Sequence, residues 1–127
     1  MYTNRITRAL PWLTLVTLCM LGAPIARADY SDAAIARTYV VSGAEPASGD
    51  LISFDSVTDA LRASNVASDQ SLFGVVVTNP VLVLRAAGAT VPIVTSGQVF
   101  VNVTTLGGPI KAGDLITTSS IAGKGQF

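Results

Sequence analysis

The sequence predicts an all-β fold, and three observations support this expectation. Beyond residue 28, valine, isoleucine and threonine supply 29 of the 99 residues, whereas leucine, lysine, glutamate and glutamine together supply 13, and β-branched residues favour strands. Val99, Val101 and Val103 alternate with mostly polar residues, which is the period of a half-buried strand. A loop of Pro, Gly and Asp occurs twice, each time before an apolar segment. Together they predict a compact β barrel or sandwich with two pseudo-repeated hairpins, preceded by an N-terminal signal helix.

Residues 1–28 have the three parts of an export signal. Arg5 and Arg8 form a positively charged start, an apolar segment follows, and Ala26-Arg27-Ala28 matches a small-x-small cleavage pattern. The apolar segment covers 14 residues, fewer than the roughly 20 that a membrane-spanning helix needs. We therefore expect a signal peptide whose cleavage is specified by Ala26 and Ala28. The alternative is an uncleaved membrane anchor or an N-terminal core helix.

The rest of the chain is interpreted as a leader over residues 29–37 and one β domain over residues 38–127. Its eight acidic and five basic residues give a net charge of −3. No basic stripe is interleaved with aromatic residues, so no nucleic-acid partner is expected. The chain has no His and a single Cys, Cys19, in the signal segment. Imidazole catalysis, His-containing zinc sites and an internal disulfide are therefore excluded.

Short β-branched segments between Gly, Pro, Ser and Asp predict eight strands. They cover residues 36–42, 50–54, 60–64, 72–78, 81–85, 91–95, 98–104 and 114–118. Residues 60–64 are equally compatible with a helical turn capped by Ser56 or Thr58. The unbroken apolar segments 71–78 and 81–84 are typical of strands covered on both faces. Pro92 predicts that the strand over 91–95 begins at a sheet edge.

The repeated loop has the chemistry of a tight turn. Proline restricts φ, glycine supplies a positive φ, and aspartate accepts amide hydrogen bonds before the chain enters a strand. We therefore expect two equivalent structural turns, about 64 residues apart, formed by Pro46, Gly49 and Asp50 and by Pro109, Gly113 and Asp114.

This ordered series of turns resembles the β-clip type module of phage tail-fibre proteins, capsid-decoration proteins and bacterial surface proteins. The resemblance covers about residues 38–125 and is carried by the segments GDLI (49–52), LFGVV (72–76), VPIV (91–94), SGQVFV (96–101) and GPIKAGDLIT (108–117). It implies an all-β, often trimeric, non-catalytic assembly module. Some fibre relatives have an autoproteolytic chaperone function, but none of its catalytic residues matches a position here.

Two features depart from that family. An export signal is unlike the phage relatives and favours a cell-surface or secreted role. In similar modules a further strand usually follows the loop over residues 123–127, so we expect either that the sequence is truncated or that a neighbouring molecule supplies the last strand.

Residues that could carry chemistry are interpreted as structural. Four aspartates lack the alternating oxygen ligands of an EF-hand calcium loop, so solvated turn carboxylates are expected at Asp50, Asp55, Asp59 and Asp69. A Ser/Lys hydrolase would pair Ser119 or Ser120 with Lys124 or Lys111, but no motif surrounds them. Asn102 is expected on the outward side of its strand, and core positions are expected for Phe54, Phe73 and Phe100.

No catalytic, cofactor-binding or metal-binding residue is assigned, and the chain is not expected to be an enzyme. We expect an exported structural or interaction module, secreted or on the cell surface, that forms a homo-oligomer such as a trimer or binds another surface protein. Membrane contact is expected only through the signal segment or through sequence downstream. The alternative is a Ser/Lys-type hydrolase or a self-cleaving fibre-associated domain.

Overall fold

The computed structural model describes residues 34–127, and this part of the chain contains strands but no helix. The all-β prediction is confirmed for these residues, whereas the signal segment with Ala26 and Ala28 lies outside them. Two strands pair as a separate ribbon, β7 (Thr117–Thr118) and β8 (Gly125–Gln126). Six strands form the main sheet: β1 (Ile35–Tyr39), β2 (Leu51–Asp55), β3 (Ala60–Ala63), β4 (Leu72–Val76), β5 (Leu82–Leu84) and β6 (Val91–Val94).

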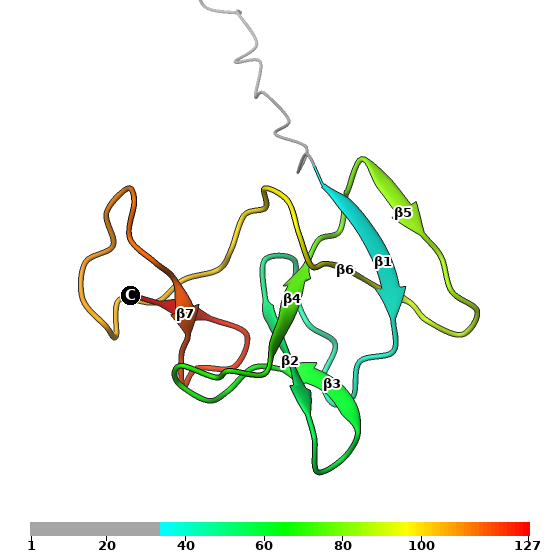
Figure 1. Ribbon diagram of the computed structural model, residues 1–127, viewed down its shortest axis with the longest axis horizontal. Coiled ribbons are helices and arrows are strands. Elements are labelled where there is room, and N and C mark those ends of the chain that lie inside the picture. The colour runs from blue at the N-terminus through cyan, green and yellow to red at the C-terminus, as the bar shows by residue number, and fades with distance from the viewer. Residues whose placement is uncertain (1–33) are drawn as a thin grey trace, which may run out of the picture. The chain divides into compact units, whose positions relative to one another are not determined.

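The main sheet is mixed, with the strand order β3-β2-β4-β6-β1-β5. β1 and β5 are parallel, and all other neighbours are antiparallel. The β2–β4 register shifts between Ile52 and Ser53, an irregularity of the kind that bends a strand. Figure 1 shows β5 at one end of the domain and the β7–β8 ribbon at the other.

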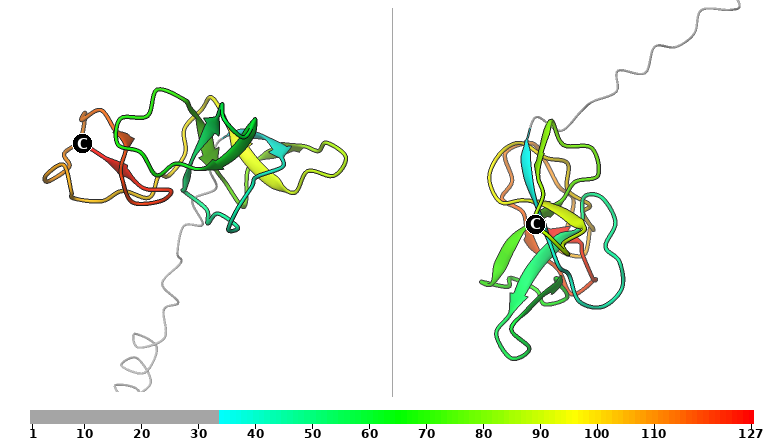
Figure 2. Two further views of the ribbon diagram at one scale, coloured as in Figure 1. Left: turned by 90° about the horizontal axis from the view of Figure 1, so that it is seen from below. Right: turned by 90° about the vertical axis from the view of Figure 1, so that its right-hand side faces the viewer.

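The sheet curls around its larger core. Beyond β1, Val41 forms a parallel bridge with Leu61 of β3, and the Ser42 N–H donates to the Leu61 carbonyl at 2.7 Å. This contact covers the outer edge of β3, and the two views in Figure 2 show that the strands twist rather than lie flat. The enclosed core consists of Ile52, Val76 and Ile93, with Tyr39, Val41, Leu61, Phe73 and Val91 packed against them.

A smaller core lies on the opposite face of the sheet. It contains Ala34, Ala36, Val77 and Val94, with Val99 packed against it. Between the two cores, a Cβ atom on Gly74 of β4 would lie 2.6 Å from the Val94 carbonyl oxygen and 2.7 Å from Ile93 Cγ2. Because no side chain fits there, glycine permits the close approach of β4 and β6.

Two local predictions are decided by the structure. β3 is a strand, so the helical turn considered for residues 60–64 is wrong. β6 lies between β4 and β1, so the edge position inferred from Pro92 is also wrong. The Pro92 carbonyl accepts the Val77 N–H at 3.1 Å, beyond the last β4–β6 pair, Val76 with Ile93. In this register Pro92 lies opposite Val77, and the return hydrogen bond to Val77 is missing because proline has no N–H, so the β4–β6 ladder ends there.

Two predicted strands are not formed as expected. Residues 98–104 contain only an isolated bridge, between Val103 and Gly125. The Asn102 N–H donates to the Gly49 carbonyl, while the Asn102 carbonyl accepts the Gly125 N–H. Because the segment divides its hydrogen bonds between two partners, it builds no continuous ladder. The strand expected over residues 114–118 is limited to β7.

Candidate functional site

The two repeated loops form the same hydrogen bonds. In the first loop, the Asp50 N–H donates to the Ala47 carbonyl at 3.1 Å, and the Ala47 N–H donates to Asp50 Oδ2 at 2.9 Å. In the second, the Asp114 N–H donates to the Lys111 carbonyl at 3.1 Å, and the Lys111 N–H donates to Asp114 Oδ2 at 2.7 Å. Each aspartate therefore closes its own four-residue turn.

The glycines occupy the turn position that requires a positive φ. Gly49 has φ +86° and Gly113 has φ +93°, and each is the third residue of its turn, as in a type II turn. Pro46 and Pro109 precede the turns. Neither proline restrains a central turn residue, so the glycine and the aspartate carry the repeated geometry.

Asp50 is the centre of a polar cluster with Asn102 and Lys124. Asp50 Oδ1 accepts the Lys124 ammonium at 2.7 Å and the Asn102 side-chain amide at 2.9 Å. The Asn102 amide also donates to the Ser48 carbonyl at 2.8 Å. Only 8% of the Asp50 surface is exposed. The carboxylate is thus buried with a charged partner, which is the usual condition for burying an ionised group.

The surroundings of Asp50 favour its ionised form. Burial alone would raise its pKa, but hydrogen bonds from Lys124, Asn102 and the Ala47 N–H together outweigh burial and lower the pKa below its ordinary value. Hydrogen bonding to a charged carboxylate lowers its pKa in this way. Near neutral pH the Asp50 carboxyl group is therefore ionised and paired with Lys124, so it has no proton to donate.

The Asp50 cluster fastens the C-terminal ribbon to the main sheet. The Leu51 N–H donates to the Gly123 carbonyl at 2.9 Å, and the Gly123 N–H donates to the Ser64 carbonyl at 2.7 Å. A Cβ atom on Gly123 would lie 2.6 Å from Asp50 Cγ. Glycine is needed at residue 123 because the loop passes directly over the carboxylate.

Sequence reasoning missed the cluster because its members are far apart in the chain. Asn102 was expected to point outward, but it binds Asp50 across 52 residues, and Lys124 binds Asp50 across 74 residues. Among the three phenylalanines expected in the core, Phe73 packs there, against Tyr39 in an edge-to-face contact with ring centroids 5.0 Å apart. Phe54 and Phe100 are exposed, contrary to the prediction.

The second turn lies in much more open surroundings than the first. Leu51 and Ile52 follow Asp50 and are buried, whereas Leu115, which follows Asp114, is 87% exposed. The Thr117–Gln126 pair places Ile116 beside Phe127, and the Phe127 backbone contacts Gly107. We call these exposed residues the C-terminal surface: Leu106, Leu115, Ile116 and Phe127.

A second exposed apolar surface lies along β5, which pairs only with β1 among the described strands. Ile35 pairs with Leu82 and Arg37 pairs with Leu84, so these side chains project from the same face. The expectation that residues 81–84 are covered on both faces is wrong for this chain alone. We call the exposed residues the β5 surface: Ile35, Val81, Leu82 and Leu84.

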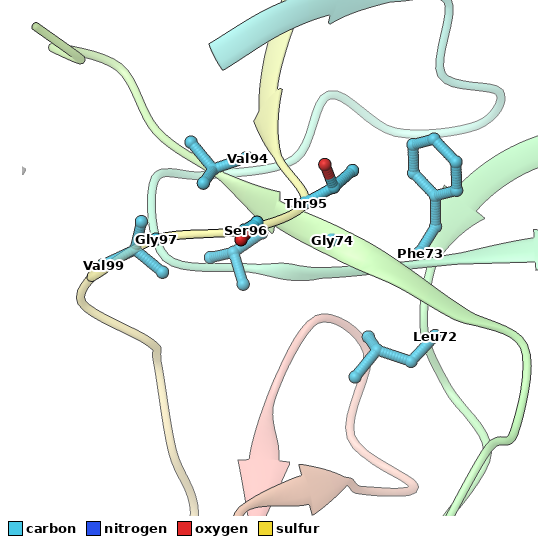
Figure 3. A pocket seen from close by; sticks show the side chains of 9 residues that line it. Leu72, Phe73, Gly74, Val94, Thr95, Ser96, Gly97 and Val99 are labelled. Atoms are coloured by element: carbon cyan, nitrogen blue, oxygen red, sulfur yellow. The ribbon is translucent and has the colours of Figure 1, made fainter. Parts of the chain in front are cut away.

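A shallow pocket of about 240 Å³ lies between β4 and the segment that follows β6. Leu72 and Phe73 project to opposite sides of β4, as Figure 3 shows. The lining is mostly apolar, and Thr95 and Ser96 contribute hydroxyl groups. No lining residue is charged, so this pocket offers shape and apolar contact without an acid or a base.

Two of the four residues considered for hydrolysis, Ser119 and Lys124, have structural partners. The Ser119 hydroxyl accepts the Ile121 N–H at 3.1 Å and donates to the Ile121 carbonyl at 3.2 Å. Lys124 donates to Asp50, as described above. These contacts stabilise the loop between β7 and β8.

The aspartates considered for calcium do not gather. Asp55 accepts the Val57 N–H at 2.9 Å and pairs with Arg62 at 3.1 Å, and Asp69 accepts the Ser71 N–H at 2.8 Å. Within residues 34–127, no group of three or more His, Cys, Asp or Glu side chains is arranged to hold a metal ion. The described part of the chain also has no helix with the length and apolar character to span a lipid bilayer.

Comparisons with known proteins do not assign the chain to a family. No family model matches the sequence, and no curated protein or solved structure is similar to it above the threshold of significance.

Proposed function

We propose that this protein is an exported, non-catalytic structural or interaction module of the cell surface or of a secreted assembly, which acts by self-association or by binding a partner. One observation carries the proposal: two apolar surfaces, at opposite ends of the domain, are exposed to solvent. Contiguous exposed apolar surface is typical of interaction sites. The N-terminal sequence pattern supports export, and the order of the turns supports a β-clip type module.

The test is the identity and size of the product made by cells that express the full sequence. We expect a chain that begins at Asp29, recovered outside the cytoplasm, with a solution mass above that of one chain or with a bound partner protein. Mass spectrometry and light scattering measure these properties. Retention in the cytoplasm, or an exported monomer that binds no partner, would contradict the proposal.

The hydrolase alternative makes a different prediction. It requires the hydroxyl of Ser119 or Ser120 to be free to attack a substrate and to lose its proton to Lys124 or Lys111. A fluorophosphonate probe would then label the wild-type chain, and either Ser119→Ala or Ser120→Ala would abolish the labelling. The proposed module predicts no labelling of any of these chains.

A further inference from the structure

We propose that the C-terminal surface of one molecule binds the β5 surface of a second copy of this chain, with Asp114 of the first facing Arg85 of the second. The inference rests on the proposed function and names the partner and the two surfaces. It follows from a comparison of the two repeated turns, because the first turn shows what this element binds when it is covered.

The first turn is covered by two kinds of group. A lysine ammonium occupies the second oxygen of Asp50, and the apolar residues that follow are paired with β3 and β4, for example Leu51 with Val75 and Ile52 with Ala63. In the first copy, neighbouring strands therefore bury the apolar residues that follow the turn, and a cation pairs with the aspartate of the turn.

Among residues 34–127, neither group covers the second turn. Asp114 Oδ2 accepts the Lys111 N–H, and Asp114 forms no ion pair within the described residues. Leu115 and Ile116 are exposed and pair with no strand in residues 34–127. Burial of such apolar surface stabilises an association by about 25 cal/mol per Å² before the costs of binding are subtracted.

The β5 surface supplies both groups. The chain segment around β5, residues 79–84, is uncharged and mostly apolar, and Arg85 follows it directly. Neither Arg85 nor the nearby Arg37 forms an ion pair in the part of the chain that the structure describes. β5 is an edge strand with one neighbour, and an edge strand offers unpaired backbone groups to another chain. No acidic residue occurs between residues 79 and 90, so the segment around β5 contains no carboxylate to pair with Arg85.

The geometry of the contact determines the type of assembly. The two surfaces differ, and they lie at opposite ends of the domain in Figure 1. Contact between unlike surfaces is head-to-tail, and it generates a closed ring when the rotation closes or a filament when it does not. A trimeric ring is one such closure.

Exchange of the two charges tests the contact. Sedimentation velocity of the full chain over a concentration series would compare the wild type with Asp114→Arg, with Arg85→Asp and with an equal mixture of the two variants. Each variant alone places like charges opposite each other, and we expect association to weaken by at least about tenfold. In the mixture, the two variants can alternate, so that opposite charges meet at every contact of a filament or an even-numbered ring and at two of the three contacts of a trimeric ring. We therefore expect association to recover towards the wild-type level.

Matched controls separate the contact from general effects on charge and hydrophobicity. Glu45 is exposed and belongs to neither surface. The Glu45→Arg variant should therefore associate as the wild type does. Leu115→Ser should weaken association, whereas Val57→Ser should not, although Val57 is 92% exposed in the β2–β3 turn. A cooperative urea transition in each variant would show that it is folded, with a slightly lower midpoint for Asp114→Arg, which loses its turn hydrogen bond from the Lys111 N–H.

Three results would overturn the inference. The first is wild-type association by both charge variants, and the second is a mixture that stays as dissociated as either variant alone. In both cases association by another surface would leave the proposed function standing. The third is a wild-type chain that stays monomeric at every concentration. If that chain also captures no partner protein, the proposed function fails as well.

Discussion

Asp50 and Asp114 occupy equivalent turns and differ in what else they bind. Asp50 binds Asn102 and Lys124 in addition to its own turn, whereas the Asp114 side chain binds only the Lys111 N–H within residues 34–127. Loss of Asp50 would remove the acceptor of the partly buried Lys124 ammonium and one of the two acceptors of the Asn102 amide. Leaving such partners unsatisfied costs more than the loss of the hydrogen bonds themselves.

We therefore predict that Asp50→Ala lowers the free energy of unfolding by about 2–4 kcal/mol. Asp114→Ala should lower it by about 0.5–1.5 kcal/mol, as for the loss of one turn hydrogen bond. Urea denaturation of the two variants measures the difference. Equal losses would show that the ion pair with Lys124 contributes nothing beyond the shared turn.

Gly123 and Gly88 offer a matched comparison of crowding. Both have nearly the same backbone conformation, with φ +73° and +74°. A Cβ atom on Gly123 would meet Asp50 at 2.6–2.9 Å, whereas a Cβ atom on Gly88 would meet nothing within 4 Å. Any side chain strains both backbones equally, so the contact with Asp50 is the difference between them.

We expect Gly88→Ala to cost about 1 kcal/mol from its positive φ alone. Gly123→Ala should cost about 1–3 kcal/mol more, because the loop must move away from Asp50. Thermal unfolding of both variants checks this order. A similar shift in both melting temperatures would mean that the loop adjusts freely and that Asp50 does not need it in place.

At the scale of elements, the β4–β6 pair is closely packed around Gly74. Val75 pairs with Val94 and Val76 with Ile93, and this pair joins the β3-β2-β4 part of the sheet to the β6-β1-β5 part. A Cβ atom on Gly74 would collide with β6, 2.6 Å from the Val94 carbonyl oxygen. Sheet continuity therefore depends on a residue that has no side chain.

Gly74→Ala should force β4 and β6 apart and lower the free energy of unfolding by about 1–3 kcal/mol, the usual cost of overpacking. The added methyl group would meet backbone at Val94 O as well as the Ile93 side chain, so a change of rotamer alone cannot relieve it. Urea denaturation measures the loss. Unchanged stability would show that the strands separate without cost.

β6 also shows how pairing decides what a proline does. In sequence, Pro92 indicates an edge, because proline donates no hydrogen bond to a ladder. In the fold, β6 is central, and the proline lies just beyond the last β4–β6 pair. Where a ladder ends is a property of two strands, so it is not visible in one of them.

At the scale of the whole molecule, three ionised carboxylates stabilise the described domain. The pKa of Asp50 is lowered for the reasons given above. The Val57 N–H lowers the pKa of Asp55, and the Ser71 N–H lowers the pKa of Asp69. A carboxylate whose folded-state pKa is depressed contributes its full stabilisation above its unfolded pKa and loses it as the pH falls through the folded one.

The free energy of unfolding should therefore decrease as the pH is lowered below about 4, the ordinary pKa of aspartate. Asp50→Asn should lose less stability between neutral and acidic pH than the wild type, because it has no charge to neutralise. Asp59→Asn, in the β2–β3 turn, serves as the control and should follow the wild type. Parallel pH profiles for the wild type and Asp50→Asn would show that ionisation of Asp50 does not stabilise the fold.

The sequence alone determined the local chemistry of this protein. Its β-branched composition predicted an all-β domain, because β-branched side chains suit strands. Gly49 and Gly113, each followed by aspartate, indicated two tight turns, because a turn is decided by a few adjacent residues. The absence of His and the position of Cys19 limited the available chemistry in the same direct way.

Only the tertiary structure decided which strands meet and which surfaces stay bare. The contacts of Asp50 with Asn102 and Lys124 join residues 52 and 74 positions apart, and no local pattern encodes such a meeting. Residues 81–84 were expected to form a strand covered on both faces, and residues 115–116 to lie in a strand. The exposed side chains are nevertheless Val81, Leu82, Leu84, Leu115 and Ile116. Hydrophobicity states that a segment favours burial, but only the arrangement of the other strands determines whether one molecule provides it.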